Sequence, residues 1–141
     1  MTFDPRDTAA FAAFVRAQGR AVVATVAPSG VPEAALVGMA ALDDGTLIFD
    51  ASDDSRKIHN LRENGRVAVV AGTDGDVTVQ VEGVATIASD TSREFHGAAY
   101  NEQFAGSRAL DQGFAVVVVR PDWVRVYDAS ARPAVVTEAR W

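Results

Sequence analysis

Apolar and polar residues alternate along much of the chain, with the period of two that is typical of half-buried β-strands. The alternation is clearest over 77–87, where every second residue from Val77 to Val81 faces the same way. Similar alternation and short runs rich in Val predict further strands at 21–27, 31–42, 46–51, 66–71, 115–119 and 123–127. The long segment 31–42 is expected to bend near Gly38.

A helical period replaces this alternation in two or three places. The first helix is expected over about 5–18, with Asp4 as its N-cap, and a second over 55–64. A glycine follows each of these two segments and provides a stop signal. Thr91 and Glu94 have the spacing of a capping box, which predicts the start of a third helix.

Turns join most of the strands directly, so the sequence predicts hairpins and an antiparallel sheet rather than a parallel α/β sheet. Six or seven strands of this kind usually close into a barrel, which removes free edges. The uninterrupted apolar run at 115–119 is expected to be covered on both faces, Pro121 to interrupt the chain after it, and Gly83 to mark a bulge or a close approach. We therefore expect one domain over 1–141, made of the helix at 5–18, a barrel at about 20–127 and a tail without clear period at 128–141.

Charge and composition exclude several kinds of partner. The net charge is −6, which argues against nucleic acid and against an anionic membrane surface, since both attract clustered cations. No apolar run reaches the length of a membrane span, and the first residues lack the basic-then-apolar order of a signal peptide, so a cytoplasmic protein is expected. The absence of cysteine excludes thiolate catalysis and Cys-based zinc sites.

Few residues are available for chemistry by the protein alone. The two histidines, His59 and His96, are not part of a metal-binding pattern, so no metal site is expected. The sequence has no serine-hydrolase elbow, no dinucleotide-binding glycine fingerprint and no P-loop, and its paired aspartates lie in expected turns. No catalytic residue can be named. This suggests a cofactor that brings its own reactivity.

Ser55, Arg56 and Lys57 form the most suggestive motif, because two cations stand at the positive end of the second predicted helix. Ser55 can cap this helix, and free backbone N–H groups, a hydroxyl, a guanidinium and an ammonium would together suit a phosphate. The alternative is that Asp53 and Asp54 simply neutralise the two cations on a solvated surface.

The stretch 47–67 (LIFDASDDSRKIHNLRENGRV) resembles the FMN-binding split β-barrel family, whose best-known member is pyridoxamine 5'-phosphate oxidase. Three further segments resemble the same family in the same order, and these are 24–32, 79–85 and 120–124. The resemblance covers roughly 20–127 and implies an antiparallel split β-barrel, mainly β with inserted helices.

The resemblance also implies roles for individual residues. Arg56 and Lys57, helped by Ser55, would hold the FMN phosphate. Four more residues would line the same site, namely Ala51 and Ser52 at a strand end and Val37 and Gly38, whose backbone would pass along the flavin ring. Gly38 would leave the space that such contact requires.

A second group of residues is expected on later strands. Thr78 takes the place of a glutamine that contacts the flavin in the oxidase, and Gln80 lies nearby on the same face. Trp123 is either a wall of the flavin site, offered by a second subunit, or a core residue. Members of the family are homodimers with flavin at the interface, so the same assembly is expected here.

The expected function is therefore FMN-dependent electron or hydride transfer to a small molecule, with NADH or NADPH as a candidate donor. Pyridoxamine phosphate oxidation itself is not expected, because the chain lacks the oxidase's C-terminal arginine and histidine motif. Two alternatives stay open: a non-catalytic flavin-binding or stress-response protein, and the same fold holding a deazaflavin or haem.

Overall fold

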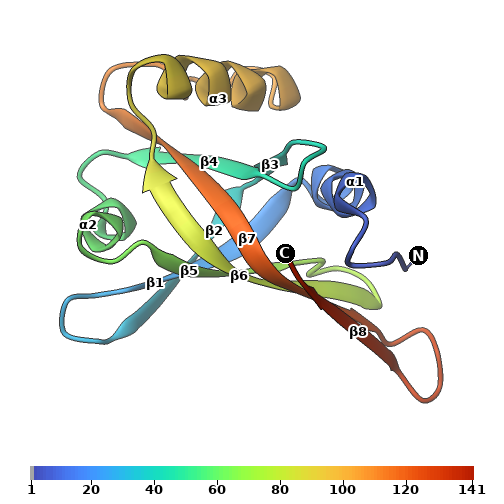
Figure 1. The fold of residues 1–141 in the computed structure, drawn as a ribbon. Helices are drawn as coiled ribbons and strands as arrows, with labels where there is room; N and C mark the ends of the chain where they lie inside the picture. The colour runs from blue at the N-terminus through green and yellow to red at the C-terminus, as the bar shows by residue number, and fades with distance from the viewer. Residues whose placement is uncertain (1) are drawn as a thin grey trace.

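One antiparallel sheet of eight strands curls around most of the core in the computed structural model, which describes residues 2–141 (Figure 1). The strands are β1 (Arg20–Val26), β2 (Pro32–Gly38), β3 (Ala40–Ala41), β4 (Leu47–Ser52), β5 (Arg66–Ala71), β6 (Val77–Ile87), β7 (Phe114–Asp128) and β8 (Val135–Arg140). Their order is β2-β1-β5-β6-β7-β4-β3, and β8 pairs with β7. The expected antiparallel split barrel is confirmed.

The sheet closes incompletely. β2 is an edge strand that pairs with β1, while β3 pairs with β4 at the other end of the sheet. Met39 alone separates β2 from β3, so the long strand expected at 31–42 bends beside Gly38, as predicted. β2 and β4 lie close together but form no ladder. We call this unpaired boundary between the two strands the split in the barrel.

Three helices cover the ends and one side of the barrel, and they are α1 (Thr8–Gln18), α2 (Arg56–Glu63) and α3 (Asp90–Gln103). The N-cap of α1 is Asp7 rather than the expected Asp4, because the Asp7 carboxylate accepts a hydrogen bond from the Ala10 amide at 3.0 Å. The capping box expected at Thr91 is also wrong, since α3 begins at Asp90 with no side-chain capping bond. None of the helices within residues 2–141 is long and apolar enough to cross a membrane.

β7 differs from the sequence prediction because it runs unbroken through Pro121. The β6–β7 ladder shifts register between Glu82 and Gly83, and Gly83 then stands opposite Pro121. A Cβ at Gly83 would lie 2.5 Å from the Arg120 carbonyl oxygen, so only glycine fits this close approach. The bulge lets the strand accept a proline, and the prediction of a special role for Gly83 is confirmed.

The tail expected at 128–141 is largely ordered as a strand. β8 pairs with Trp123–Asp128 of β7, and the two form an arm that extends away from the barrel (Figure 1). Trp141 then returns to the barrel, where its ring packs edge-on against Phe11 and its Nε1 donates to the Pro5 carbonyl at 2.8 Å. The side chains of β8 are mostly exposed, so the sequence lacks the hydrophobic alternation that would predict this strand.

The core has two layers divided by β4 and β7. Phe49 and Val117 point into the barrel with Phe11 and Ile58, while Val116 and other alternate residues pack under α3. The apolar run at 115–119 is therefore covered on both faces, as expected.

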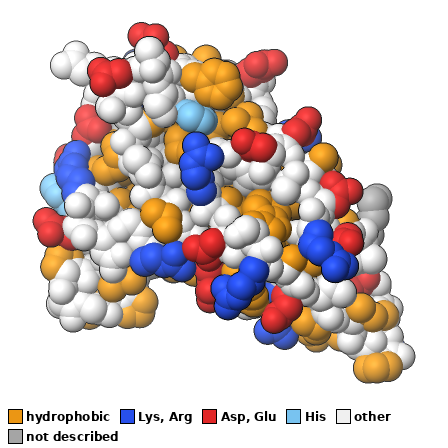
Figure 2. All heavy atoms as spheres, in the orientation of Figure 1, with side chains coloured by type: hydrophobic (Ala, Val, Ile, Leu, Met, Phe, Trp, Pro, Cys, Tyr) orange, Lys and Arg blue, Asp and Glu red, His pale blue; other side chains and the backbone are white. Residues whose placement is uncertain are grey.

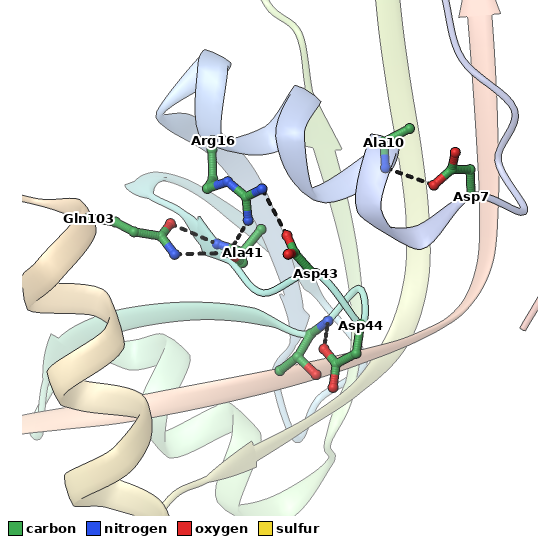
Figure 3. A network of polar contacts seen from close by, with 8 residues as sticks. Asp7, Ala10, Arg16, Ala41, Asp43, Asp44 and Gln103 are labelled. Carbon is green, nitrogen blue, oxygen red and sulfur yellow. Dashed lines mark hydrogen bonds and ion pairs between the residues drawn. The ribbon is translucent and has the colours of Figure 1, made fainter.

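Polar contacts tie α1 and α3 to β3 and the turn that follows it (Figure 3). The Gln103 side chain of α3 pairs with the backbone of Ala41, accepting from its N–H at 3.1 Å and donating to its carbonyl at 2.9 Å. Arg16 of α1 donates to the same carbonyl and to Asp43. These contacts hold β3 and the following turn against both helices.

Candidate functional site

The beginning of α2 presents the motif that the sequence singled out. Ser55 takes the extended N-cap conformation, yet its side chain makes no capping bond, contrary to expectation. Its Oγ is buried and has no hydrogen-bond partner within residues 2–141. The first turn carries Arg56 and Lys57 and no acidic residue, so the positive end of the helix is uncompensated within its own turn.

Arg56 finds its partner on β2 rather than in the preceding turn. Its Nη1 donates to Glu33 Oε2 at 3.0 Å. Asp54 instead accepts a hydrogen bond from the Ser52 hydroxyl at 2.6 Å. Within residues 2–141, neither Asp53 nor Asp54 forms an ion pair with Arg56 or Lys57. Lys57 forms no ion pair with any residue of the described chain.

A buried network holds Glu33 in place, and sequence reasoning missed it. Asn60 of α2 donates from Nδ2 to Glu33 Oε1 at 2.8 Å and to Thr25 Oγ1 at 2.9 Å. Thr25 and Glu33 stand opposite each other in the β1–β2 ladder. Asn60 and Thr25 are both buried. A signal was present, because Thr25 occupies an inward position in an otherwise apolar alternation.

Several of these side chains, but neither Ser55 nor Asn60, line a pocket of about 330 Å³ between β1, β2 and the start of α2. Its lining consists of Val23, Thr25, Glu33, Ala34, Ala35, Arg56 and Lys57. The pocket thus combines two cations, one carboxylate and a wall of small side chains on an edge strand. Such a pocket suits the anionic group of a ligand, and the rest of that ligand would then lie along β2.

The other four residues expected around this site are not among those that line the pocket in the described part of the chain. Ala51 is buried at the end of β4, and Ser52 follows it on the surface. Val37 and Gly38 lie at the far end of β2. The space at Gly38 has an occupant of its own, since a Cβ there would lie 2.6 Å from the Tyr100 hydroxyl oxygen.

Thr78, Gln80 and Trp123 do not join this pocket in one chain. They lie on the outer face of the sheet, which we define as the face directed away from the barrel core. Gln80 stands opposite Arg125, and Trp123 opposite Glu82, while the intervening valines point inward. β1 and β5 separate this region from β2 in the sheet. Trp123 is partly exposed and outside the core.

Tyr100 forms a second polar feature near the split. Burial raises the pKa of the Tyr100 hydroxyl above its usual value, and the neighbouring Asp50 carboxylate raises it further. Its ring stacks on Phe104 at a centroid distance of 4.6 Å. Within residues 2–141, no three His, Asp or Glu side chains gather in a way that could hold a metal ion.

Comparison with solved structures gives relatives of the whole fold. A conserved hypothetical protein from Mycobacterium tuberculosis is 25% identical, with a TM-score of 0.73 and 90% of each chain covered. A haem-binding protein from Mycobacterium smegmatis is 20% identical with a TM-score of 0.77, and the match covers 99% of this chain but 59% of that one. A pyridoxamine 5'-phosphate oxidase-related, FMN-binding protein from Nostoc punctiforme is 14% identical with a TM-score of 0.66, and 94% of this chain and 93% of that one are covered.

No curated protein matches the sequence significantly. The family model described as pyridoxamine 5'-phosphate oxidase matches residues 7–128, which include α1, the pocket and both strands that carry the outer-face residues. The chain therefore belongs to the pyridoxamine 5'-phosphate oxidase family.

Proposed function

We propose that this protein binds FMN at the start of α2 and transfers electrons or hydride between that flavin and a small molecule, with NADH or NADPH as the donor. The observation that carries the proposal is the cluster of Ser55, Arg56 and Lys57 beside a pocket. Family membership and the FMN-binding relative from Nostoc punctiforme support the choice of cofactor.

The donors at this place fit a phosphate. The buried Ser55 hydroxyl lacks a partner, Lys57 lacks an ion pair within the described residues, and Arg56 engages Glu33 through one nitrogen. A phosphate would accept hydrogen bonds from all three side chains and from first-turn amides of α2. A phosphate that reached the first turn of α2 would also satisfy the buried Ser55 hydroxyl, which has no partner within residues 2–141.

The edge of β2 offers a place for the rest of the cofactor. From Glu33 to Gly38 the strand runs about 16 Å, and it lacks a ladder partner on the side of the split. Ala34 and Ala35 have small side chains, so a planar group could approach the backbone of this stretch closely. Bound flavin would supply the hydride chemistry, while the chain's own residues bind and orient it.

A homodimer belongs to the same proposal. Thr78, Gln80 and Trp123 lie on the outer face, away from Arg56, so one chain alone does not assemble both groups. The outer face also exposes apolar side chains such as Leu36 and Tyr127. Hydrophobic side chains lie along the projecting β7–β8 arm as well (Figure 2). Such unpartnered apolar surface favours association with a second copy.

The decisive experiment is a spectrum of the purified protein before and after adding FMN and then NADPH. We expect quenched flavin fluorescence on binding and bleaching of the flavin absorbance on reduction. The proposal fails if the protein neither carries nor binds flavin. Light scattering during gel filtration tests the dimer, and cell fractionation tests the cytoplasmic location that we also propose.

Two other functions are compatible with the same fold. A non-catalytic flavin-binding protein would bind FMN without turnover, and the pocket lining indeed contains no His, Tyr or Cys. A haem or deazaflavin could replace FMN, and similarity to the haem-binding protein from Mycobacterium smegmatis favours testing haem. The absorbance spectrum and the mass of the bound ligand separate these outcomes from FMN.

A further inference from the structure

The proposed phosphate pocket already contains an anion of its own, the Glu33 carboxylate. Both of its oxygens are engaged, one by Arg56 at 3.0 Å and the other by Asn60 at 2.8 Å. The Glu33 side chain is 25% exposed, whereas that of Arg56 is 86% exposed. Of this pair, the carboxylate is held and the guanidinium is free to move.

Glu33 cannot leave the pocket without disturbing buried groups. Asn60 is buried and uses the same nitrogen to reach Glu33 and Thr25, so removing the carboxylate would deprive a buried amide of an acceptor. The β1–β2 ladder also fixes the Glu33 backbone opposite Thr25. The carboxylate therefore stays in the pocket when a ligand enters.

The charges that line the pocket then limit how strongly it attracts a doubly charged anion. Arg56 and Lys57 contribute two positive charges and Glu33 one negative charge, which leaves one net positive charge. A phosphate monoester carries nearly two negative charges at neutral pH, whereas a phosphodiester carries one. A fixed carboxylate repels the second charge of the monoester.

We infer that Glu33 is a specificity-determining residue, which weakens binding of doubly charged phosphate groups at this pocket and narrows their advantage over singly charged phosphodiesters. The inference rests on the proposed function, because it assumes that the cofactor phosphate enters here. It goes beyond that function by assigning the charge selectivity to one residue.

The test compares three ligands with the same ring: FMN, its monomethyl phosphate ester and riboflavin. Their phosphate groups carry about two, one and no negative charges, respectively. Affinities are measured by fluorescence quenching for the wild type and Glu33→Gln. Glutamine keeps an acceptor for Asn60 but removes the charge. We expect E33Q to strengthen FMN binding roughly tenfold relative to riboflavin, and to strengthen FMN more than the methyl ester.

Glu63→Gln is the matched control, because Glu63 is an exposed residue at the other end of α2 and its removal changes the net charge equally. E63Q should leave the ratio of FMN to riboflavin affinity close to that of the wild type. Circular dichroism verifies that E33Q is folded. An unchanged or lowered ratio in E33Q overturns the inference and indicates that Glu33 positions Arg56 instead.

Failure of the proposed function is distinguishable from failure of this inference. If no flavin binds to the wild type or to E33Q, the flavin proposal fails, and inorganic phosphate becomes the probe. Phosphate should then raise the melting temperature of E33Q more than that of the wild type. An equal shift, or no shift in either protein, overturns the role of Glu33 as well.

Discussion

The hydroxyl oxygen of Tyr100 on α3 lies 2.6 Å from the position that a Cβ atom would take at Gly38 on β2. Gly38 does not have a positive φ, so space alone requires glycine here. The contact with Tyr100 therefore explains a glycine at position 38 without any contact to a flavin ring.

This contact predicts the effect of Gly38→Ala. The added methyl group must displace the buried Tyr100 hydroxyl, and we expect a loss of about 1–3 kcal/mol in the free energy of unfolding. In a Tyr100→Phe background the loss should shrink, because the obstructing oxygen is gone and the next contacts, at 3.6 Å, are ordinary. Urea denaturation of the four proteins measures both effects. Gly75→Ala, where a Cβ meets nothing within 4 Å, is the control.

Tyr100 also predicts how stability changes in alkali. Its pKa is raised in the folded protein, by burial first and by the Asp50 carboxylate second. An unfolded tyrosine loses its proton near pH 10, so above that pH the unfolded chain binds fewer protons than the folded one. The stability of the wild type should therefore fall as the pH rises through about 10. Tyr100→Phe should lose less over the same range, and equal losses in melting temperature would contradict the assignment.

The strands that sequence alone located are those whose pattern reports burial. Val77–Ile87 alternates along its whole length and forms β6 with those same bounds. The α2 segment was recognisable because Ile58 and Leu61 share one buried face. β8 was not, since its side chains are mostly exposed and backbone pairing with β7 holds it.

The site divides in the same way. The position of Arg56 and Lys57 at a helix start follows from the local sequence, and the structure places both residues in the first turn of α2. The Glu33 partner of Arg56 depends on how β2 approaches α2, which no local pattern contains. The occupant of the space at Gly38 likewise comes from a helix sixty residues later in the chain. Contacts of this kind require the folded topology.

Asn60 should contribute more to stability than its surface neighbours. Asn60→Leu removes the donor that Thr25 and Glu33 share in a buried position, and we expect a loss of about 2–3 kcal/mol. Thr25→Val removes one of the two bonds and should cost less. Chemical denaturation of both variants checks the order. A loss for Asn60→Leu within about 0.5 kcal/mol of zero would mean that the network is not formed.

Arg56 and Lys57 should matter far more for the cofactor than for the fold. Each charge-assisted bond to a phosphate contributes about 1.5–3 kcal/mol, so Arg56→Ala or Lys57→Ala should weaken FMN binding roughly tenfold or more. Stability without cofactor should change by about 1 kcal/mol or less, because the Arg56–Glu33 pair is solvent-exposed on the arginine side and both cations stand at the unfavourable end of α2. Arg62→Ala, in the last turn of the same helix, is the matched control and should leave FMN affinity nearly unchanged. FMN titrations and melting curves test the two halves separately. A large loss of stability with unchanged affinity would assign both cations to the fold and remove the phosphate site from α2.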